Sequence, residues 1–474
     1  MNYPDSVHFL YALGNEIKTA KFGLERIRAL LDALGRPQDR LHFVHVAGTN
    51  GKGSVCAMLE SALRAAGRRT GLFTSPHLAE PTERIRIDGA PLSAERFAGA
   101  FDRIHAAVEA LIAQGAIDMH TTYFETVTAM ALAVFDEERV DVVVLEVGLG
   151  GRLDATNVVV PDLAVITPVD FDHEAFLGKS LESIAREKAG ILKPGVPAVF
   201  ARQRPEAARV LEARLVDARW TGHWPVSDLE LDARGSRFRL LGLTDLGDSP
   251  RGAGFSLRGA SAPPDDRVAR ASTGSPHIQC PPADDQFQSR DRQEAVAPLH
   301  IHCPLAGEHQ VENAVTAAVA LMRLGVPNSA IETGIAGAQW PGRLEHVSES
   351  PEIILDGAHN PAGARALAAY IQRFYSARPV RLIYGAMRDK AVAEISGILF
   401  PLAGQVIVTA PRQARALAPE TMCQISDHPN LAIAPGIEAA LAMVADAAPD
   451  DVIFVTGSLF LVAEARALLV TESR

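Results

Sequence analysis

The chain has 474 residues, of which 47% are hydrophobic, and its 46 Lys and Arg against 57 Asp and Glu give a formal net charge of -11. This composition predicts a soluble protein with more than one globular domain and excludes wholesale disorder. The acidic balance argues against nucleic-acid and membrane partners. The sequence has no apolar run of membrane-spanning length and no basic leader, and its four cysteines are widely spaced, so we expect a cytoplasmic protein.

Short β-rich runs alternate with longer helical stretches from residue 41 onward. The strands are predicted as continuous apolar runs, which is typical of parallel strands covered on both faces. Such alternation predicts an α/β fold with a mostly parallel sheet. The predicted strands are 41–47, 69–74, 141–147 and 163–167, and the predicted helices are 52–66 and 122–138.

Residues 242–298 have a different composition from the rest of the chain. They are rich in Pro, Gly, Ser, Asp and Arg and carry almost no periodic apolar positions. Such a segment cannot bury enough apolar surface to offset the entropy of ordering it. We predict a disordered insertion in a surface loop; a docking or regulatory arm is the alternative.

A second α/β unit follows the insertion. A helix is predicted at 308–324, a break falls at 339–342, and the alternation then restarts. We therefore divide the chain into domains 1–339 and 340–474. The later predicted strands are 353–355, 381–384, 405–409 and 451–455.

Residues 45–54, with the sequence HVAGTNGKGS, follow a predicted strand and open a predicted helix. Glycines let the backbone curl round an anion, the helix N-terminus adds partial positive charge, and Lys52 supplies an ammonium for phosphates. The general phosphate-loop pattern has Ser or Thr directly after this Lys, whereas Gly53 stands there in this chain. We predict a nucleotide site whose ATP contacts are Thr49, Asn50, Gly51, Lys52, Gly53 and Ser54.

The segment GTNGKGS at 48–54, taken with KFGLER at 21–26 and TGSL at 456–459, resembles the Mur ligase superfamily. Within it, the chain resembles folylpolyglutamate synthases and bifunctional dihydrofolate synthase/folylpolyglutamate synthases. The resemblance covers nearly the whole chain apart from the insertion, and a Gly after the Lys is usual in that family. It implies a P-loop Mur-ligase-type ATPase domain followed by a smaller Rossmann-like α/β domain.

The same resemblance implies an activity. It indicates an ATP-dependent ligase that adds L-glutamate to 7,8-dihydropteroate, to folate (poly)glutamates, or to both, through an acyl phosphate. ATP would be a co-substrate with Mg²⁺, two ions being expected, and a monovalent cation is also implied. We expect a monomer whose partners are these small molecules.

Glu146 ends a predicted strand, at the edge of a parallel sheet where ligands bind. It is well placed to hold Mg²⁺ against phosphate oxygens, although a solvated strand-end Glu is the alternative. The resemblance adds Ser75 and His173 as metal ligands. It also matches Lys188 to a lysine that becomes carbamylated, a change that would turn an ammonium into an anionic oxygen ligand.

Five further positions acquire roles through the resemblance. Asn313, Arg343 and Asp356 would contact the nucleotide, with the planar guanidinium of Arg343 suited to clamping a phosphate. His359 and Ser458 would lie near the incoming glutamate. The residues expected to act in catalysis are Lys52, Lys188 and His359.

Three segments match those that hold the pterin in bifunctional enzymes. Aromatic rings there could stack on a flat heterocycle, and Asp154 could accept a hydrogen bond from its amino group. Core packing is the alternative for each single ring. The expected acceptor-binding residues are Phe22, Gly23, Leu24, Glu25, Thr122, Tyr123, Phe124, Glu125, Leu153, Asp154 and Ala155, with Ser458 on the glutamate side.

Two other functions remain open from the residues. Another Mur-type ligase would add an amino acid to a nucleotide-linked precursor, and it usually carries a GTxGKT loop. A non-catalytic ATP-binding regulator would be expected to have damaged catalytic positions, whereas Lys52, Glu146 and Lys188 are intact.

Overall fold

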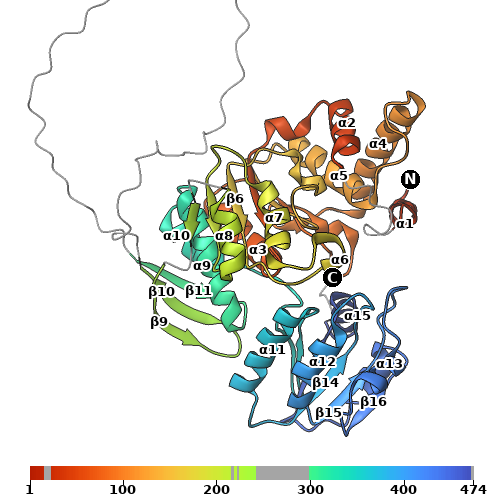
Figure 1. Cartoon of the computed structure of the whole chain (residues 1–474), viewed down its shortest axis with the longest axis vertical. Helices are drawn as coiled ribbons and strands as arrows, with labels where there is room; N and C mark the ends of the chain where they lie inside the picture. The colour runs from red at the N-terminus through yellow and green to blue at the C-terminus, as the bar shows by residue number, and fades with distance from the viewer. Residues whose placement is uncertain (15–22, 215–217, 221–223, 242–297, 471–474) are drawn as a thin grey trace, which may run out of the picture.

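The computed structural model describes residues 1–14, 23–214, 218–220, 224–241 and 298–470. Within this part of the chain, strands form an eight-stranded, a three-stranded and a six-stranded sheet (Figure 1). The eight-stranded sheet belongs to the N-terminal domain and the six-stranded sheet to the C-terminal domain. Among the described helices, none is both long and apolar enough to cross a membrane.

The N-terminal sheet has the order β4-β3-β2-β5-β1-β6-β7-β8 and is parallel from β2 to β8. The edge strands β3 and β4 are antiparallel. Its strands are β1 (Phe43–Ala47), β2 (Thr70–Phe73), β3 (Ile85–Ile87), β4 (Ala90–Pro91), β5 (Val142–Glu146), β6 (Leu163–Ile166), β7 (Ala198–Phe200) and β8 (Ala218–Trp220).

Helices bury both faces of this sheet, which explains its continuous apolar strands. In β1, Val44 and Val46 pack in one core with α3, α9 and α10, whereas Phe43 packs in another with α2, α4 and α5. A third core joins α7 and α8 to β6 and β7. The N-terminal helices are α1 (Tyr3–Ala12), α2 (Glu25–Ala33), α3 (Lys52–Ala65), α4 (Ala94–Ala113), α5 (Tyr123–Glu137), α6 (Glu174–Leu177), α7 (Leu181–Lys188), α8 (Pro205–Glu212), α9 (Glu308–Arg323) and α10 (Asn328–Ala336).

The three-stranded sheet is a feature that the sequence reading did not predict. It is antiparallel, with β10 (Ser236–Leu240) between β9 (Val226–Leu231) and β11 (Leu299–Cys303). Leu240 and Leu299 are directly opposite each other, so the chain leaves and re-enters the sheet at neighbouring points. The predicted insertion at 242–298 lies outside the described residues except for its last position.

The C-terminal sheet has the order β12-β13-β17-β14-β15-β16 and is parallel except for β12. With the first sheet it confirms the predicted α/β class. Its strands are β12 (Glu345–Glu349), β13 (Glu352–Leu355), β14 (Val380–Tyr384), β15 (Gln405–Val408), β16 (Leu431–Ile433) and β17 (Val452–Thr456), and its helices are α11 (Pro361–Phe374), α12 (Val392–Leu399), α13 (Pro419–Ile425), α14 (Ile437–Ala442) and α15 (Leu459–Leu469).

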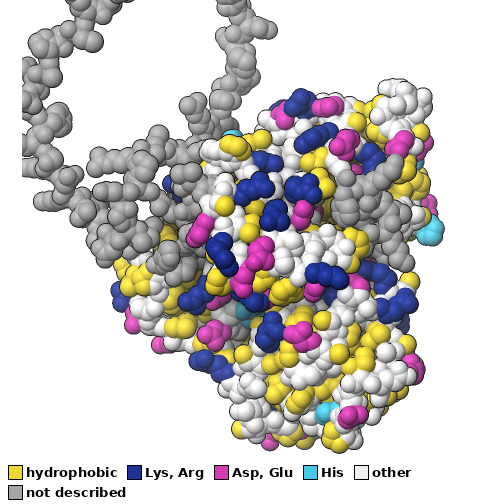
Figure 2. All heavy atoms as spheres, in the orientation of Figure 1, with side chains coloured by type: hydrophobic (Ala, Val, Ile, Leu, Met, Phe, Trp, Pro, Cys, Tyr) yellow, Lys and Arg dark blue, Asp and Glu magenta, His cyan; other side chains and the backbone are white. Residues whose placement is uncertain are grey.

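Charged side chains of both signs are interspersed on the face of the molecule drawn in Figure 2.

The carboxyl ends of the central strands in the two large sheets carry the loops that meet between the domains. A hydrogen bond from Asn360, after β13, to Asn50, after β1, joins the two sets of loops. This is the edge at which α/β sheets bind ligands.

Candidate active site

The loop between β1 and α3 has the backbone that the glycine pattern predicted. Gly48 and Gly51 have φ of 151° and 83°, a region that other residues rarely adopt. A Cβ on Gly51 would lie 2.3 Å from Asn313 Oδ1, and one on Gly53 would lie 2.7 Å from the Trp340 ring. These glycines therefore allow α9 and Trp340 to approach the start of α3 closely.

Two amides in the first part of this loop are already hydrogen-bonded within the protein. The amides of Thr49 and Asn50 both donate to the carbonyl of Pro168, at 2.9 and 3.3 Å. The amides available to a phosphate are instead those of the first turn of α3, where an α-helix leaves its N–H groups without helical acceptors. The anion cradle thus begins at the helix N-terminus.

Lys52 and Asn313 flank that N-terminus from two sides. Lys52 Nζ donates to the carbonyl of Thr49 at 3.1 Å, which folds the ammonium back over the loop. Asn313 is buried and donates to Gln310 Oε1 at 2.9 Å, and Gln310 in turn donates to Ser54 Oγ at 3.3 Å. The structure therefore places Asn313 next to the phosphate loop, from a position 261 residues later in the chain.

Glu146 and Ser75 meet at the carboxyl ends of the adjacent parallel strands β5 and β2. Glu146 is 3% exposed, and its Oε2 accepts the backbone N–H of Ser75 at 3.1 Å. Burial raises the pKa of Glu146, and the positive charges of Lys52 and Arg343 act against that rise. A buried carboxylate beside a hydroxyl is a donor set that suits Mg²⁺.

Lys188 is buried at the C-terminal end of α7, and its Nζ donates to the carbonyl of Gly48 at 2.8 Å. Desolvation, followed by the nearby charge of Lys52, lowers its pKa from 10.5 to about 7. A large fraction of this amine is therefore neutral at neutral pH, and only a neutral amine can attack carbon dioxide. The position of Lys188 beside the phosphate loop was not visible in its local sequence, which reads as a surface helix end.

Asp172, in the N-terminal domain, contacts side chains of the C-terminal domain. Its Oδ1 accepts a charged hydrogen bond from Lys390 Nζ at 2.7 Å, and its Oδ2 accepts one from Asn360 Nδ2 at 3.3 Å. His359 Nε2 lies 3.7 Å from the same carboxylate. Burial opposes ionisation, but the His359 hydrogen bond and the Lys390 charge hold the pKa of Asp172 well below its ordinary value.

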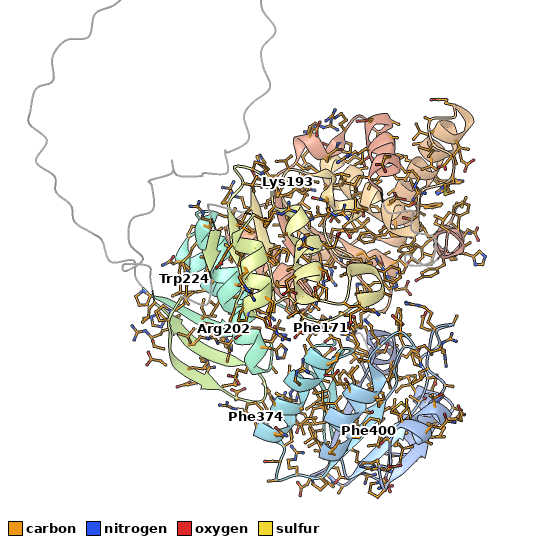
Figure 3. All side chains as sticks on the ribbon, in the orientation of Figure 1. Phe171, Lys193, Arg202, Trp224, Phe374 and Phe400 are labelled. Atoms are coloured by element: carbon orange, nitrogen blue, oxygen red, sulfur yellow. The ribbon has the colours of Figure 1, made fainter. Side chains whose placement is uncertain are left out.

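The predicted ligand His173 belongs to this Asp172 group. Its Nε2 is 3.9 Å from Asp172 Oδ2, and its backbone has a φ of 50°. Burial is the main cause that lowers its pKa to about 4, so the imidazole is neutral at neutral pH. Phe171, two residues before His173, lies on the side of the N-terminal domain that faces the C-terminal domain (Figure 3).

Asp172, Asn360 and Lys390 are residues to which the sequence reading gave no role. Lys390 lies in the loop between β14 and α12, and its local sequence carries no signal that it pairs with Asp172. Asn360 reads in the sequence as a helix cap alone, because its side chain caps α11 by accepting the N–H of Gly363.

Arg343 lies near one carboxylate of each domain, Glu146 and Asp356. Burial lowers its pKa, and the charges of Asp356 and Glu146 act in the opposite direction. Asp356 is buried and accepts the backbone N–H groups of Leu344 and Ala358, each at 3.0 Å. Leu344 has a φ of 47°, a strained conformation that the Asp356 hydrogen bond stabilises.

The expected acceptor segments lie at the starts of α2 and α5 and after β5. Thr122 and Glu125 form the capping box of α5, and Glu125 also pairs with Arg26 at 3.2 Å. Tyr123 is buried, stacked on Tyr11 and covered by Arg84 at 5.0 Å. Both rings of the segment are packed against protein, because Phe124 is also buried and contacts Phe73.

The remaining acceptor residues have local structural contacts. Asp154 is buried, and its two oxygens accept the backbone N–H groups of Leu149 and Thr156. These bonds shape the turn that also holds Leu153 and Ala155. Leu24 is buried before α2, Gly23 is partly buried, Glu25 is exposed, and Phe22 lies outside the described residues. Ser458 is buried and caps α15 through the N–H of Phe460.

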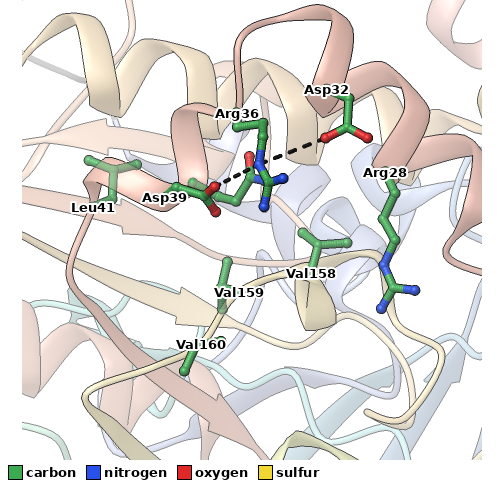
Figure 4. A pocket seen from close by; sticks show the side chains of 9 residues that line it. Arg28, Asp32, Arg36, Asp39, Leu41, Val158, Val159 and Val160 are labelled. Carbon is green, nitrogen blue, oxygen red and sulfur yellow. Dashed lines mark hydrogen bonds and ion pairs between the residues drawn. The ribbon is translucent and has the colours of Figure 1, made fainter.

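A surface pocket of about 490 Å³ lies apart from these groups (Figure 4). Residues from the end of α2 and the segment 158–160 line it, and Arg36 there pairs with Asp32 and Asp39. None of the residues expected to bind ATP or metal lines this pocket. The site between the domains is therefore defined by its chemistry and not by this cavity.

Comparison with known proteins agrees with this geometry. Residues 46–214 match the Mur ligase middle domain, and residues 342–459 match the glutamate ligase domain of Mur ligases. The chain is 32% identical to the folylpolyglutamate synthase of Lacticaseibacillus casei, covering 99% of both chains. It is 35% identical to the dihydrofolate synthase/folylpolyglutamate synthase of Mycobacterium tuberculosis, covering 94% of this chain and 89% of the relative.

A solved structure extends the likeness to three dimensions. E. coli FolC in complex with DHPP and ADP superposes with a TM-score of 0.78 at 31% identity, covering 99% of this chain and 97% of that one. These full-length matches favour one branch of the superfamily over the other Mur-type ligases. The chain belongs to the folylpolyglutamate synthase/dihydrofolate synthase family of Mur ligases and is an ATP-dependent ligase.

Proposed function

We propose that the enzyme joins L-glutamate both to 7,8-dihydropteroate and to folate (poly)glutamates, in a site formed where domains 1–339 and 340–474 meet. The observation that carries the proposal is the meeting of four charged groups between the domains. Lys52 and Glu146 come from the N-terminal sheet edge, and Arg343 and Asp356 from the C-terminal domain. Such a set can bind a triphosphate and stabilise the charge of phosphoryl transfer.

In the first step, an oxygen of the acceptor carboxylate attacks the γ-phosphorus of ATP. The bond from that phosphorus to the β–γ bridging oxygen breaks, so an acyl phosphate and ADP form. Lys52 and Arg343 stabilise the negative charge that spreads over the transferring group. The first-turn amides of α3 hold the other phosphates, and Asn313 borders the nucleotide.

In the second step, the amine of L-glutamate attacks the acyl carbon. A tetrahedral intermediate forms and then loses inorganic phosphate, which leaves an amide. His359 Nδ1 lies 2.8 Å from the carbonyl oxygen of Gly357, and its Nε2 faces Asp172 Oδ2 at 3.7 Å. Asp172 holds the His359 ring where we place the incoming glutamate, and the proton released by the amine leaves with the inorganic phosphate.

The residues present fit the Mg²⁺ ions that the family implies. Ser75 and Glu146 would supply oxygen ligands of one ion, and burial raises the pKa of Glu146 in spite of the nearby Lys52 and Arg343, a cost that a bound cation would offset. His173 and a carbamylated Lys188 would hold a second. Bound Mg²⁺ would neutralise charge on the phosphate oxygens. The monovalent cation, the monomeric state and the cytoplasmic compartment stay predictions.

Carbamylation of Lys188 is part of the proposal. The neutral amine attacks the carbon of CO₂, a C–N bond forms, and one proton leaves to solvent. Incubation with ¹³C-bicarbonate should give a carbamate signal by ¹³C NMR in the native chain and none in Lys188→Met. An unchanged signal in Lys188→Met would contradict the assignment.

The acceptor assay tests the function. Purified enzyme receives ATP, Mg²⁺ and glutamate with dihydropteroate, with a reduced folate monoglutamate, or with neither, and ADP and the amide product are measured. We expect ADP release and product with each acceptor and neither without one. Release that ignores the acceptor and glutamate would overturn the ligase mechanism, and product with one acceptor alone would restrict the substrate range.

A further inference from the structure

A second cluster of metal-binding side chains lies on the N-terminal domain, outside the groups described above. His105 and Glu109 project from α4, and His120 lies in the connection from α4 to α5. One potential ligand atom from each residue lies within 4.8 Å of the other two. Helix α4 packs against α1 and α5, on the part of the N-terminal domain away from the C-terminal domain (Figure 1).

The helix places two of the three ligands in one line. Ser93 caps α4, and Phe101, Ile104 and Val108 bury the face that looks into the core. His105 and Glu109 are four residues apart, so they lie one above the other at the margin of that buried face. His105 is partly buried and Glu109 is exposed, which gives an ion a route from solvent.

The two imidazoles already have the spacing of metal ligands. His105 Nδ1 lies 3.2 Å from His120 Nε2. Two nitrogens bound to a tetrahedral Zn²⁺ at about 2.0–2.1 Å are roughly 3.4 Å apart. An ion would therefore fit between these nitrogens after a small adjustment of the rings.

The surrounding contacts fix which ring nitrogens face each other. His120 Nδ1 lies 2.9 Å from the carbonyl oxygen of Thr121, so this nitrogen carries the proton and Nε2 has the lone pair. Phe9 packs on both imidazoles, with centroids 4.7 Å from His105 and 5.4 Å from His120. Phe101 stacks on His105 at 5.6 Å. Rings held in this way lose little freedom when an ion binds.

We propose that His105, Glu109 and His120 form a binding site for a divalent transition-metal ion of the Zn²⁺ class, separate from the Mg²⁺ chemistry between the domains. Two imidazoles and a carboxylate are a three-ligand set that Zn²⁺ accepts, with water as the fourth ligand. In the metal-free protein His105 donates its Nδ1 proton to His120. When the ion binds, that proton leaves Nδ1 and the ring takes its Nε2–H form.

The site has a structural consequence for the neighbouring segment. His120 is followed by Thr121 and by Thr122, the N-cap of α5. A metal bridge would tie the end of this connection to α4 and so hold the start of α5 in place. We therefore expect Zn²⁺ to raise the melting temperature of the protein, whatever its effect on turnover.

Metal titration of the full-length chain tests the proposal. The metal-stripped protein is titrated with Zn²⁺ by calorimetry, and Co²⁺ serves as an absorption probe for a tetrahedral site. We expect the wild type to bind one more equivalent than the double variant His105→Ala/His120→Ala, with a rise in melting temperature that the double variant lacks. His42→Ala, which removes a half-exposed imidazole beside Asp162, is the matched control and should bind like the wild type.

Substitutions at the exposed Glu109 keep the test decisive if the double variant fails to fold. Glu109→Gln should weaken Zn²⁺ binding at least about tenfold, and Glu109→His, which supplies a third imidazole, should restore or tighten it. His173→Ala separates the two regions, because it should leave this equivalent intact. Zn²⁺ binding that is the same in the wild type, the double variant and both Glu109 variants would overturn the site.

Discussion

Two carboxylates at the domain junction, the buried Glu146 and the partly buried Asp172, have opposite electrostatic environments. Glu146 accepts one backbone N–H, from Ser75, and burial raises its pKa. Asp172 has Lys390, Asn360 and His359 around it, and these partners hold its pKa well below the ordinary value. An undercompensated charge marks a place where a ligand is needed, whereas a compensated one joins parts of the protein. We therefore assign binding to the Glu146 region and domain contact to the Asp172 region.

Loss of Lys52 should have the largest effect, because it lies in the undercompensated region. Lys52→Ala removes the ammonium that stabilises the transferring phosphoryl group, and kcat should fall by about 10³-fold or more. The thermal unfolding curve should stay close to that of the wild type. Steady-state ADP release checks this, with the exposed Lys179→Ala as the control. Turnover within a few fold of the wild type would break the proposed distinction between the regions.

Because of Lys188, the stability of the protein should depend on pH. Its pKa in the fold is about 7 against 10.5 in the unfolded chain, so the unfolded chain binds more protons between these values. The lysine should therefore make the ligand-free protein more stable as pH rises from 7 toward 10.5, by up to about 1.4 kcal/mol per pH unit. Urea unfolding in CO₂-depleted buffer at several pH values measures this slope. Lys188→Met should lose the slope, and parallel curves would contradict the burial of a titrating amine.

The Asp172 region should show coupling between the domains. Asp172→Asn and Lys390→Met should each lower kcat/KM for glutamate about tenfold, and the double variant should lose less than the product of the two. The expected interaction is about 1 kcal/mol, which leaves the double variant little worse than either single variant. The exposed pair Arg412 and Glu438 provides the control cycle, where little coupling is expected. Additive losses at Asp172 and Lys390 would show that the ion pair does not couple the domains.

The smallest effect is expected from replacing the segment between β10 and β11. Because Leu240 and Leu299 are paired in adjacent strands, a short Gly-rich turn can replace residues 242–297. Activity of this variant should stay within about twofold of the wild type. A large loss, measured in the same assay, would give the replaced segment a part in the reaction.

The sequence predicted individual strands and helices, but it did not reveal contacts between residues that lie far apart in the chain. Strand β1, which precedes the phosphate loop, and its neighbour β5 both carry continuous apolar runs. Both strands, and helix α3, were therefore predicted to within two residues. The small antiparallel sheet was missed because no residue of β9 is buried and because 58 residues separate the paired strands β10 and β11 in the chain. The ion pair of Lys390 and Asp172 spans 218 positions and leaves no local pattern. Tyr123 and Phe124 show the same limit, since an aromatic segment looks alike whether it packs on protein or faces a ligand.

Asn360 divides its side chain between two neighbours, and this division decides what happens when the domains part. Its oxygen serves the first turn of α11, while its nitrogen reaches Asn50 and Asp172 in the other domain. Separation would break only the bonds made by the nitrogen, which water can replace, and the helix would keep its cap. The element that makes the contact would thus stay folded if the two domains separated.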